Sequence, residues 1–440
     1  MNVPIVSLNS DNSFVYHLTN IPEFNSIIHE NDFQNINAKV NKISYKSPTK
    51  QDYHIIRYNK NLLSSDEIYT IGLLRSVILN SSGNVVAFSP PKSISWINFL
   101  NLYPEKSSAI VAEEFIEGTM MNVFWDSNIG ISGAWEIATR SCVGAEISFY
   151  QEPSPEKPSM TFRSMFMEAI KEVGLDLNKL NKNYCYSFVL QHPLNRIVVP
   201  FKKPNLYLVS VYEIVHTEGG IINVSCIDMN IVKKQNELWS ETSVSFPKIY
   251  QDWDSYDNLI EKYANMNTNY EIVGVILKNL NTGARSKIRN PTYEIVRHLR
   301  GNQPKLMYQY LSLRQDGKVK DYLNYYQEYK KDFAFFRTQL HKYTTGLYHS
   351  YIDCYIKKQK PLKEFSEKYR THMYNIHQIY LTSLKEAGRH VSNTVVIEYV
   401  NKVHPTLQMY VLNYEMRKRH VDILKVDSDS ESDTKTQSII

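Results

Sequence analysis

A change in the spacing of apolar residues near Pro291 constrains the fold of this chain more than any other feature. Between residues 75 and 293, short runs of β-branched and aromatic residues alternate with turn residues, which predicts an antiparallel-rich sheet. Helical spacing interrupts these runs only at 162–173 and 253–266. After Pro291, apolar residues recur every three or four positions to about residue 419. We therefore expect an α+β chain whose sheet-rich core precedes an all-helical region.

The same patterns divide the chain into four segments. Residues 1–74 carry short mixed runs and are expected to be the N-terminal part of the core, whose main part is 75–300. Residues 301–425 are expected to form a basic, tyrosine-rich helical domain. Residues 426–440 are mostly Asp, Ser, Glu and Thr, with almost nothing apolar to bury, so we expect a disordered acidic tail.

Composition places the protein inside a cell or a virion. Hydrophobic residues make up 42% and charged residues 22% of the 440 residues, as in ordinary globular proteins. No apolar run reaches the roughly 18–20 residues that cross a bilayer, and the N-terminus does not resemble a signal peptide. The four cysteines are far apart, as expected in a reducing compartment. We expect a cytoplasmic or virion protein that is not secreted and contacts no membrane.

The abundance of Asn, Ile, Lys and Tyr suggests an AT-rich genome, such as that of a large DNA virus or a protist.

Positive charge is concentrated in the helical region. Residues 305–420 contain 20 Lys and Arg against 10 Asp and Glu, whereas the rest of the chain contains 30 against 35. A basic region of this kind suits a phosphate backbone, although long surface helices are commonly rich in lysine. Its many tyrosines are open to two interpretations, packing in the helical core or stacking on the bases of single-stranded nucleic acid.

A nine-residue segment of the core contains the most informative motif. Residues 111–119 read Val-Ala-Glu-Glu-Phe-Ile-Glu-Gly-Thr. They resemble the Lys-x-Asp-Gly signature of covalent nucleotidyltransferases, the superfamily of RNA ligases, DNA ligases and capping enzymes. In that family the lysine amine attacks the α-phosphate of ATP or GTP. Phe115 stands at the lysine position, Glu117 at the aspartate position and Gly118 at the glycine position. A phenyl ring has no lone pair with which to attack phosphorus.

Further segments resemble, in the same order, phage-type RNA ligases of the tRNA-repair kind. They are the run from Arg75 to Lys92, the strand Gly133-Ala-Trp-Glu-Ile-Ala-Thr-Arg140-Ser, the hairpin Tyr186-Ser-Phe-Val-Leu-Gln-His-Pro-Leu-Asn-Arg196, the strand Ile272-Val-Gly-Val-Ile-Leu-Lys278, and Lys287-Ile-Arg289-Asn-Pro. The resemblance implies an ATP-grasp-like nucleotidyltransferase core with ATP and Mg²⁺ as candidate cofactors. It also implies a set of nucleotide- and phosphate-binding residues: Arg75, Lys92, Glu117, Gly118, Arg140, Arg196, Lys278, Lys287 and Arg289.

The departures from the family pattern concern reactive and acidic positions. Val189 and Val273 stand where the family has glutamates that hold the ribose, a metal ion or its waters, and valine has no oxygen ligand for such a site. Residues two apart on a strand share a face, so Gln191 and Glu271 are candidate replacements, and Glu271 is the candidate metal ligand. The candidate substitute nucleophiles are Lys92 and Lys106.

These features support three hypotheses. The first is an RNA-ligase-like protein that is impaired in self-adenylation and binds RNA or another nucleic acid through its retained basic positions. The second is an active ligase that uses a substitute lysine, Lys92 above all, or joins RNA that is already adenylated. The third is a structural or virion-associated protein that reuses the fold and contacts other proteins through its helical domain.

Overall fold

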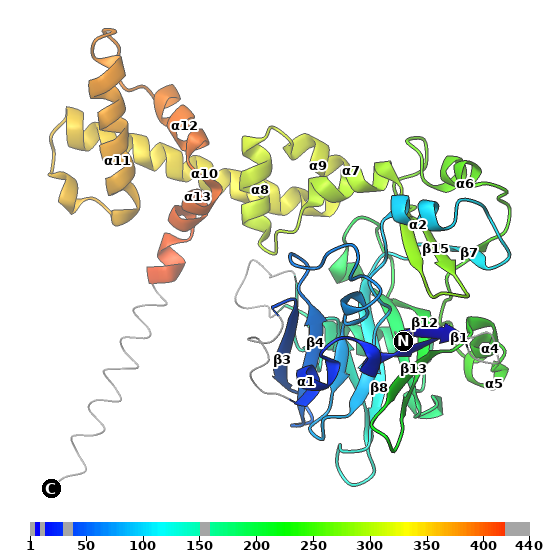
Figure 1. The fold of residues 1–440 in the computed structure, drawn as a ribbon. Coiled ribbons are helices and arrows are strands. Elements are labelled where there is room, and N and C mark those ends of the chain that lie inside the picture. The colour runs from blue at the N-terminus through cyan, green and yellow to red at the C-terminus, as the bar shows by residue number, and fades with distance from the viewer. Residues whose placement is uncertain (1–4, 9–13, 30–37, 150–158, 419–440) are drawn as a thin grey trace, which may run out of the picture. The chain divides into compact units, whose positions relative to one another are not determined.

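The computed structural model describes residues 5–8, 14–29, 38–149 and 159–418. The predicted acidic tail, 426–440, lies outside these ranges. The chain divides into two compact units, of which the first ends at His298 and the second begins at Leu299 (Figure 1). The first contains all the sheets and the second is helical, so the predicted α+β fold class is confirmed.

An eight-stranded antiparallel sheet forms the centre of the first unit. Its order is β1-β2-β13-β12-β11-β8-β9-β10. The strands span Val6–Leu8, Phe14–His17, Ile222–Cys226, Asn205–His216, Tyr184–Gln191, Thr119–Asp126, Ala134–Thr139 and Cys142–Val143. In β11 the six residues between Tyr184 and Gln191 are all buried, because both faces of the strand are covered.

Two layers cover the faces of this sheet. On one face lies α3, Phe162–Val173, which the Thr161 side chain caps and Gly174 ends in the left-handed conformation. Its Phe166 packs on Phe188 of β11 at a ring-centroid distance of 6.1 Å. The other face packs on a four-stranded sheet, β3-β4-β5-β6, where Tyr53 meets Phe124 of β8. These four strands span Val40–Lys46, Asp52–Tyr58, Val77–Leu79 and Val85–Phe88.

A second four-stranded sheet, β14-β7-β15-β16, contains the motif strands. Its strands span Ile249–Tyr250, Ile110–Glu114, Gly274–Asn279 and Arg285–Arg289. Two helices pack on it, α2 (Trp96–Leu102) and α6 (Tyr256–Tyr263). The helix expected at 253–266 is thus shorter, because the Ser255 side chain accepts a hydrogen bond from the Asn258 backbone and starts the helix at Tyr256. The chain passes from β7 of this sheet to β8 of the large sheet through residues 115–118.

Close contact between this connection and β11 requires glycine at position 118. Gly118 has φ +150°, and a Cβ there would lie 2.4 Å from the Leu190 carbonyl oxygen. The connection is therefore held directly against the large sheet, with the side chains of Phe115 and Glu117 on a fixed backbone.

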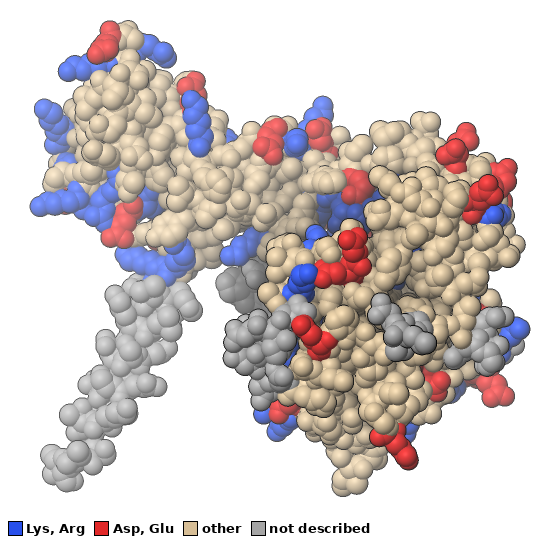
Figure 2. All heavy atoms as spheres, viewed as in Figure 1, with Lys and Arg blue, Asp and Glu red and all other residues tan. Residues whose placement is uncertain are grey.

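The second unit consists of short helices around one long one. The long helix is α10, Lys330–Tyr351. The others are α8 (Leu306–Gln315), α9 (Val319–Tyr325), α11 (Glu367–Ile379), α12 (Asn393–Lys402) and α13 (Pro405–Leu412). The preceding helix α7, Pro291–Arg300, contains the residues at which the first unit ends and the second begins. Tyr322, Tyr326 and Tyr351 are fully buried, which confirms core packing for these three tyrosines. Figure 2 shows more Lys and Arg than Asp and Glu on the visible face of this unit.

Candidate phosphate-binding site

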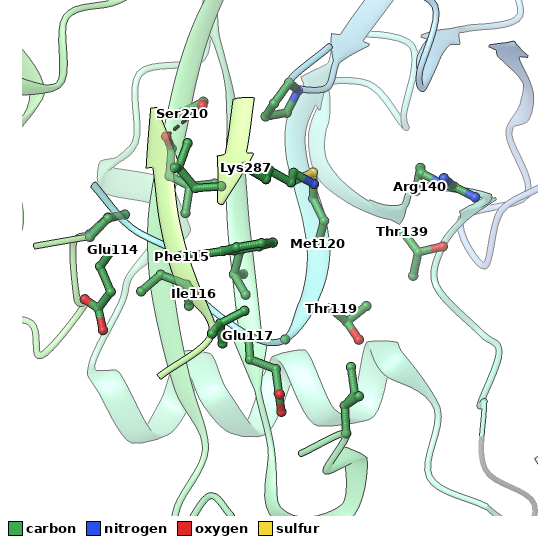
Figure 3. A pocket seen from close by; sticks show the side chains of 18 of the residues that line it. Glu114, Phe115, Ile116, Glu117, Thr119, Met120, Thr139, Arg140, Ser210 and Lys287 are labelled. Atoms are coloured by element: carbon green, nitrogen blue, oxygen red, sulfur yellow. Dashed lines mark hydrogen bonds between the residues drawn. The ribbon is translucent and has the colours of Figure 1, made fainter. Parts of the chain in front are cut away.

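A cavity of about 500 Å³ lies in the first unit, around the connection between β7 and β8. Residues 113–120 line it together with side chains from β9, β11, β12, β15 and β16. Figure 3 shows the side chains of Phe115 and Lys287 lying next to each other and pointing the same way, while Glu114 and Glu117 point elsewhere. The motif segment of the sequence is therefore a wall of this cavity.

Phe115 occupies the centre of a group of cations. The Lys287 Nζ atom lies 5.2 Å from the centroid of the Phe115 ring, and the Arg289 Cζ atom lies 5.7 Å from it. The backbone N–H of Phe115 donates to the Gly274 carbonyl oxygen at 3.3 Å, which ties the motif to β15. Two cations within about 6 Å of one ring are typical of cation–π contacts. The Phe115 ring therefore lies between basic side chains of β16 and the motif connection.

The two basic residues nearest to Phe115 differ in their partners, because Arg289 pairs with Glu294 at 3.0 Å, whereas Lys287 has no acidic partner among the described residues. Burial, with smaller contributions from the neighbouring Arg285, Arg75, Arg289 and Lys92, lowers the pKa of Lys287 to about 6. Burial also lowers the pKa of Arg75 to about 10, with contributions from Arg285 and Arg140. The Arg285 Nε atom is buried and has no hydrogen-bond acceptor within the described ranges. Like charges confined in this way attract an anion.

The carboxylates of the cavity are already engaged. Glu113 Oε2 lies 2.6 Å from the Lys278 Nζ atom, in a partly buried ion pair. Glu117 Oε1 accepts hydrogen bonds from the backbone N–H groups of Val198 and Val199 at 3.0 and 3.1 Å. Burial nevertheless raises the pKa of the Glu117 carboxyl. Glu114 Oε2 accepts a hydrogen bond from the Lys248 backbone at 3.3 Å. These three carboxylates therefore have other partners, and none of them is paired with Arg75, Arg285 or Lys287 in the described part of the chain.

Most of the residues predicted for the site line this cavity: Arg75, Glu117, Gly118, Arg140, Lys278, Lys287 and Arg289. Two do not. The Lys92 Nζ atom donates to the Ser93 carbonyl oxygen at 3.3 Å, and the Arg196 Nε atom donates to the Val198 carbonyl oxygen at 2.9 Å. Lys106 contacts Trp253, with its Nζ atom 4.5 Å from the ring centroid, and is also outside the cavity lining.

The expected replacements for the missing glutamates do not reach the cavity. Val189 and Val273 both line the cavity. Glu271 is exposed and accepts a long hydrogen bond of 3.4 Å from the Tyr270 hydroxyl, while the Gln191 side chain donates to the Glu117 carbonyl oxygen at 3.0 Å. Across the described ranges, no three His, Cys, Asp or Glu side chains are arranged to hold a metal ion.

Two cationic side chains of the cavity were missing from the sequence prediction, Arg285 and Arg297. Arg285 has a simple sequence signal, because Arg285, Lys287 and Arg289 alternate along β16 and share one face of the strand. Arg285 also lines a neighbouring cavity of about 410 Å³, to which β12, β13, β7 and β15 contribute. The two cavities meet at this guanidinium.

The helical unit has a basic hollow of its own. A cavity of about 570 Å³ is lined by α8, α9, α10 and α12, and its cationic side chains are Arg314, Lys330 and Arg337. None of the residues that line it is a carboxylate. Tyr310 and Phe333, on its wall, are themselves buried and packed together at a centroid distance of 5.1 Å. The hollow therefore presents positively charged side chains, whereas the rings of Tyr310 and Phe333 are buried by their packing against each other and the surrounding helices.

Comparisons with known proteins point to RNA ligases. No family model matches this chain. A stretch of 146 residues is 27% identical to an RNA ligase of Rhodothermus phage RM378, and it covers 32% of this chain and 32% of that ligase. About a third of this chain is RNA-ligase-like in sequence. The phage ligase is matched over only about a third of its own length.

Solved structures similar to this chain are also RNA ligases. An archaeal ATP-dependent RNA ligase aligns over 81% of this chain and 82% of its own, with 10% identity and a TM-score of 0.37. A Naegleria gruberi RNA ligase variant with ATP and Mn aligns over 43% of this chain and 51% of its own, with 13% identity and a TM-score of 0.31.

Within the described residues, no helix is both long enough and apolar enough to span a bilayer.

Proposed function

We propose that this RNA-ligase-like protein binds the phosphates of RNA, and of a nucleoside triphosphate, in the cavity beside Phe115, and that residue 115 no longer takes part in nucleotide transfer. The observation that carries the proposal is the pair of guanidinium groups of Arg75 and Arg285, which lies beside Lys287 and has no carboxylate partner among the described residues. A cluster of like charges is costly to bury, and a bound phosphate compensates it with charge-assisted hydrogen bonds.

Several further features support a phosphate ligand over a small organic one. Arg140 also lines the cavity, whereas Arg289 and Arg297 on the same wall are both paired with Glu294, at 3.0 and 3.2 Å. The hydrogen bonds of Glu117 and the ion pair of Glu113 leave these carboxylates turned to the protein. The sequence match to a phage RNA ligase makes RNA the natural source of the phosphates. ATP and Mg²⁺ remain candidate ligands on the same grounds.

The test is binding of a short RNA with and without a 5′-phosphate, measured by fluorescence anisotropy over a range of salt concentrations. Affinity should fall steeply with salt, because phosphate contacts release counterions. Arg285→Gln should weaken binding by about tenfold or more, since a charge-assisted hydrogen bond is worth roughly 1.5–3 kcal/mol. The control is Lys182→Gln, because Lys182 lies over the Trp125 ring and does not line the cavity. This variant should bind RNA as tightly as the wild type does. Salt-insensitive binding, or none, contradicts the proposal.

A further inference from the structure

The neighbouring cavity of about 410 Å³, on the other side of Arg285, has the size and lining of a site for a small organic molecule. Much of its wall is apolar. It includes the rings of Phe14, Tyr16 and Tyr212 and the aliphatic side chains of Val111, Ile227 and Met229. Ligand sites of this kind combine such a wall with a small number of polar groups that fix the orientation of the ligand.

This cavity has a buried end and an open end. Tyr16 and Tyr212 are 3% and 2% exposed, whereas Ile249 and Leu280 are 37% and 42% exposed. Asp228 also lies at the open end, where it is exposed and its carboxylate accepts a hydrogen bond from the Asn230 backbone at 2.8 Å. A ligand would therefore enter past the exposed side chains and place its far end at the two buried tyrosines.

Arg285 supplies an available positive charge at the buried end. Burial raises the pKa of the Tyr16 and Tyr212 hydroxyls, and the nearby charge of Arg285 opposes this rise. The Arg285 Nε atom is buried and has no hydrogen-bond partner among the described residues. Lys278, the other cation in the wall, already pairs with Glu113 at 2.6 Å. The cavity therefore ends at one guanidinium that can accept an anionic partner.

The other polar groups at this end are suited to binding and not to reaction. Burial raises the pKa of the Cys226 thiol to about 12, so this side chain stays protonated and is a poor nucleophile. The buried phenols of Tyr16 and Tyr212 also keep their protons, which leaves them hydrogen-bond donors.

We propose that the neighbouring cavity binds a small monocarboxylate with an aromatic or branched apolar body, whose carboxylate pairs with the Arg285 guanidinium. Two carboxylate oxygens match two parallel N–H groups of a guanidinium. The apolar body contacts the rings of Tyr16 and Tyr212. A polyanion such as a triphosphate fits this cavity poorly, because an apolar wall leaves additional charges without partners.

The shared guanidinium couples this site to the cavity beside Phe115. Arg285 lines both cavities, so a carboxylate paired with it offsets one of the charges available to a phosphate on the other side. The two ligands should weaken each other, and each must reduce the affinity of the other by the same factor. Only this mutual weakening rests on the proposed phosphate binding, whereas the carboxylate site stands without it.

The experiment is calorimetric titration of the full chain at pH 7 with 2-naphthoate and, as a matched neutral ligand, 2-naphthalenemethanol. We expect the naphthoate to bind at least about tenfold more tightly than the alcohol, because only the carboxylate forms charge-assisted hydrogen bonds. In Arg285→Gln this preference should disappear. Pyrophosphate, added first, should weaken naphthoate binding to the wild type.

Variants that fill the cavity locate the site. Ala109 and Ile249 line the neighbouring cavity and not the cavity beside Phe115. Ala109→Trp should remove naphthoate binding and leave pyrophosphate binding unchanged. Ile249→Trp, at the open end, is a second variant of the same kind, and thermal unfolding checks that each is folded. Naphthoate binding that persists in both folded variants overturns the assigned site.

The remaining outcomes separate this inference from the proposed function. Equal affinity for naphthoate and the alcohol, or no binding of either, overturns the carboxylate site. Displacement of naphthoate by adenosine, which carries no phosphate, shows a nucleoside pocket and also overturns it. Naphthoate binding without any pyrophosphate or RNA binding overturns the proposed function and leaves the carboxylate site standing.

Discussion

The Lys287 amine lies 5.2 Å from the centre of the Phe115 ring, in a cavity where its nearest charged neighbours are other cations. A hydrocarbon ring and an amine without an acidic partner among the described residues therefore lie side by side in the wall of this cavity. The electrostatics of this pair make specific predictions.

Replacing Lys287 by methionine should stabilise the fold at neutral pH. The pKa of Lys287 is about 6 in the folded chain, against about 10.4 for an unperturbed lysine, so between these values the unfolded chain binds one more proton. Stability of the wild type therefore rises with pH across this window. Lys287→Met should gain about 1–3 kcal/mol at pH 7 by urea unfolding, with the gain shrinking towards pH 10. A destabilised variant at pH 7 would contradict the burial of an unpaired base.

Binding of a phosphorylated RNA should weaken as pH rises above 6. In the free pocket Lys287 loses its proton near pH 6, while a bound phosphate favours the charged form. Binding then takes up a proton, and affinity falls by at most about tenfold per pH unit until the pKa of the bound state is passed. Fluorescence anisotropy between pH 5.5 and 8.5 measures the slope. Lys287→Gln should flatten it, and an unchanged slope in that variant would assign the effect to another group.

Replacing Glu113 by glutamine should have opposite effects on stability and on RNA affinity. The variant leaves Lys278 without its partner in a partly buried position, which costs on the order of 1–3 kcal/mol. It also makes the cavity more positive, so RNA should bind more tightly at low salt. Glu241→Gln is the matched control, because the Glu241 pair with Lys179 is exposed and exposed pairs contribute little. A parallel loss of both properties would indicate general damage to the cavity.

Alanine at position 118 should disrupt the connection that carries Phe115. A Cβ there would lie 2.4 Å from the Leu190 carbonyl oxygen, in a backbone conformation that favours glycine. We expect Gly118→Ala to lower stability by more than about 2 kcal/mol and to weaken RNA binding. Gly83→Ala is the control, because Gly83 also has positive φ but a Cβ at that position would have no neighbour within 4 Å, so it should cost only about 1–2 kcal/mol. Thermal unfolding and anisotropy together measure both effects.

Removing two arginines from the basic hollow of the helical unit should reduce the salt dependence of RNA binding. Arg314 and Arg337 both line this hollow, which has no carboxylate in its wall. If each contacts one phosphate, the Arg314→Gln, Arg337→Gln variant should lower the slope of log K against log salt by about 1–2 units. An unchanged slope would limit RNA contacts to the first unit. Arg370→Gln, whose arginine pairs with Glu367 on the surface of α11, is the control.

The sequence predicts the sheet-rich core because β-branched runs and turn residues are local signals, and the helix at 162–173 because it has both a capping threonine and a terminal glycine. The sequence also identifies most of the residues that line the cavity, because seven of the nine residues predicted for the site are found there. The family pattern says nothing about Arg285, which stands two residues from Lys287 on the same face of β16.

The remaining differences depend on contacts between distant residues. Glu117 bonds to backbone groups of Val198 and Val199, about 80 residues away, and no local pattern signals such a contact. Lys92 has the residue type expected of a phosphate ligand, but its amine is directed to the Ser93 carbonyl oxygen. Spacing predicts which face of a strand a residue occupies, and it does not predict where a long side chain at the end of a strand will point.

Arg75 follows a turn before β5, whereas Arg285 and Lys287 belong to β16, so the mutually repelling groups come from separate layers of the first unit. An inorganic anion seated among them would act as a counter-ion that joins these layers. Pyrophosphate or phosphate buffer should therefore make the purified protein more resistant to heat than an amine buffer does, and the choice of buffer would become part of handling this protein.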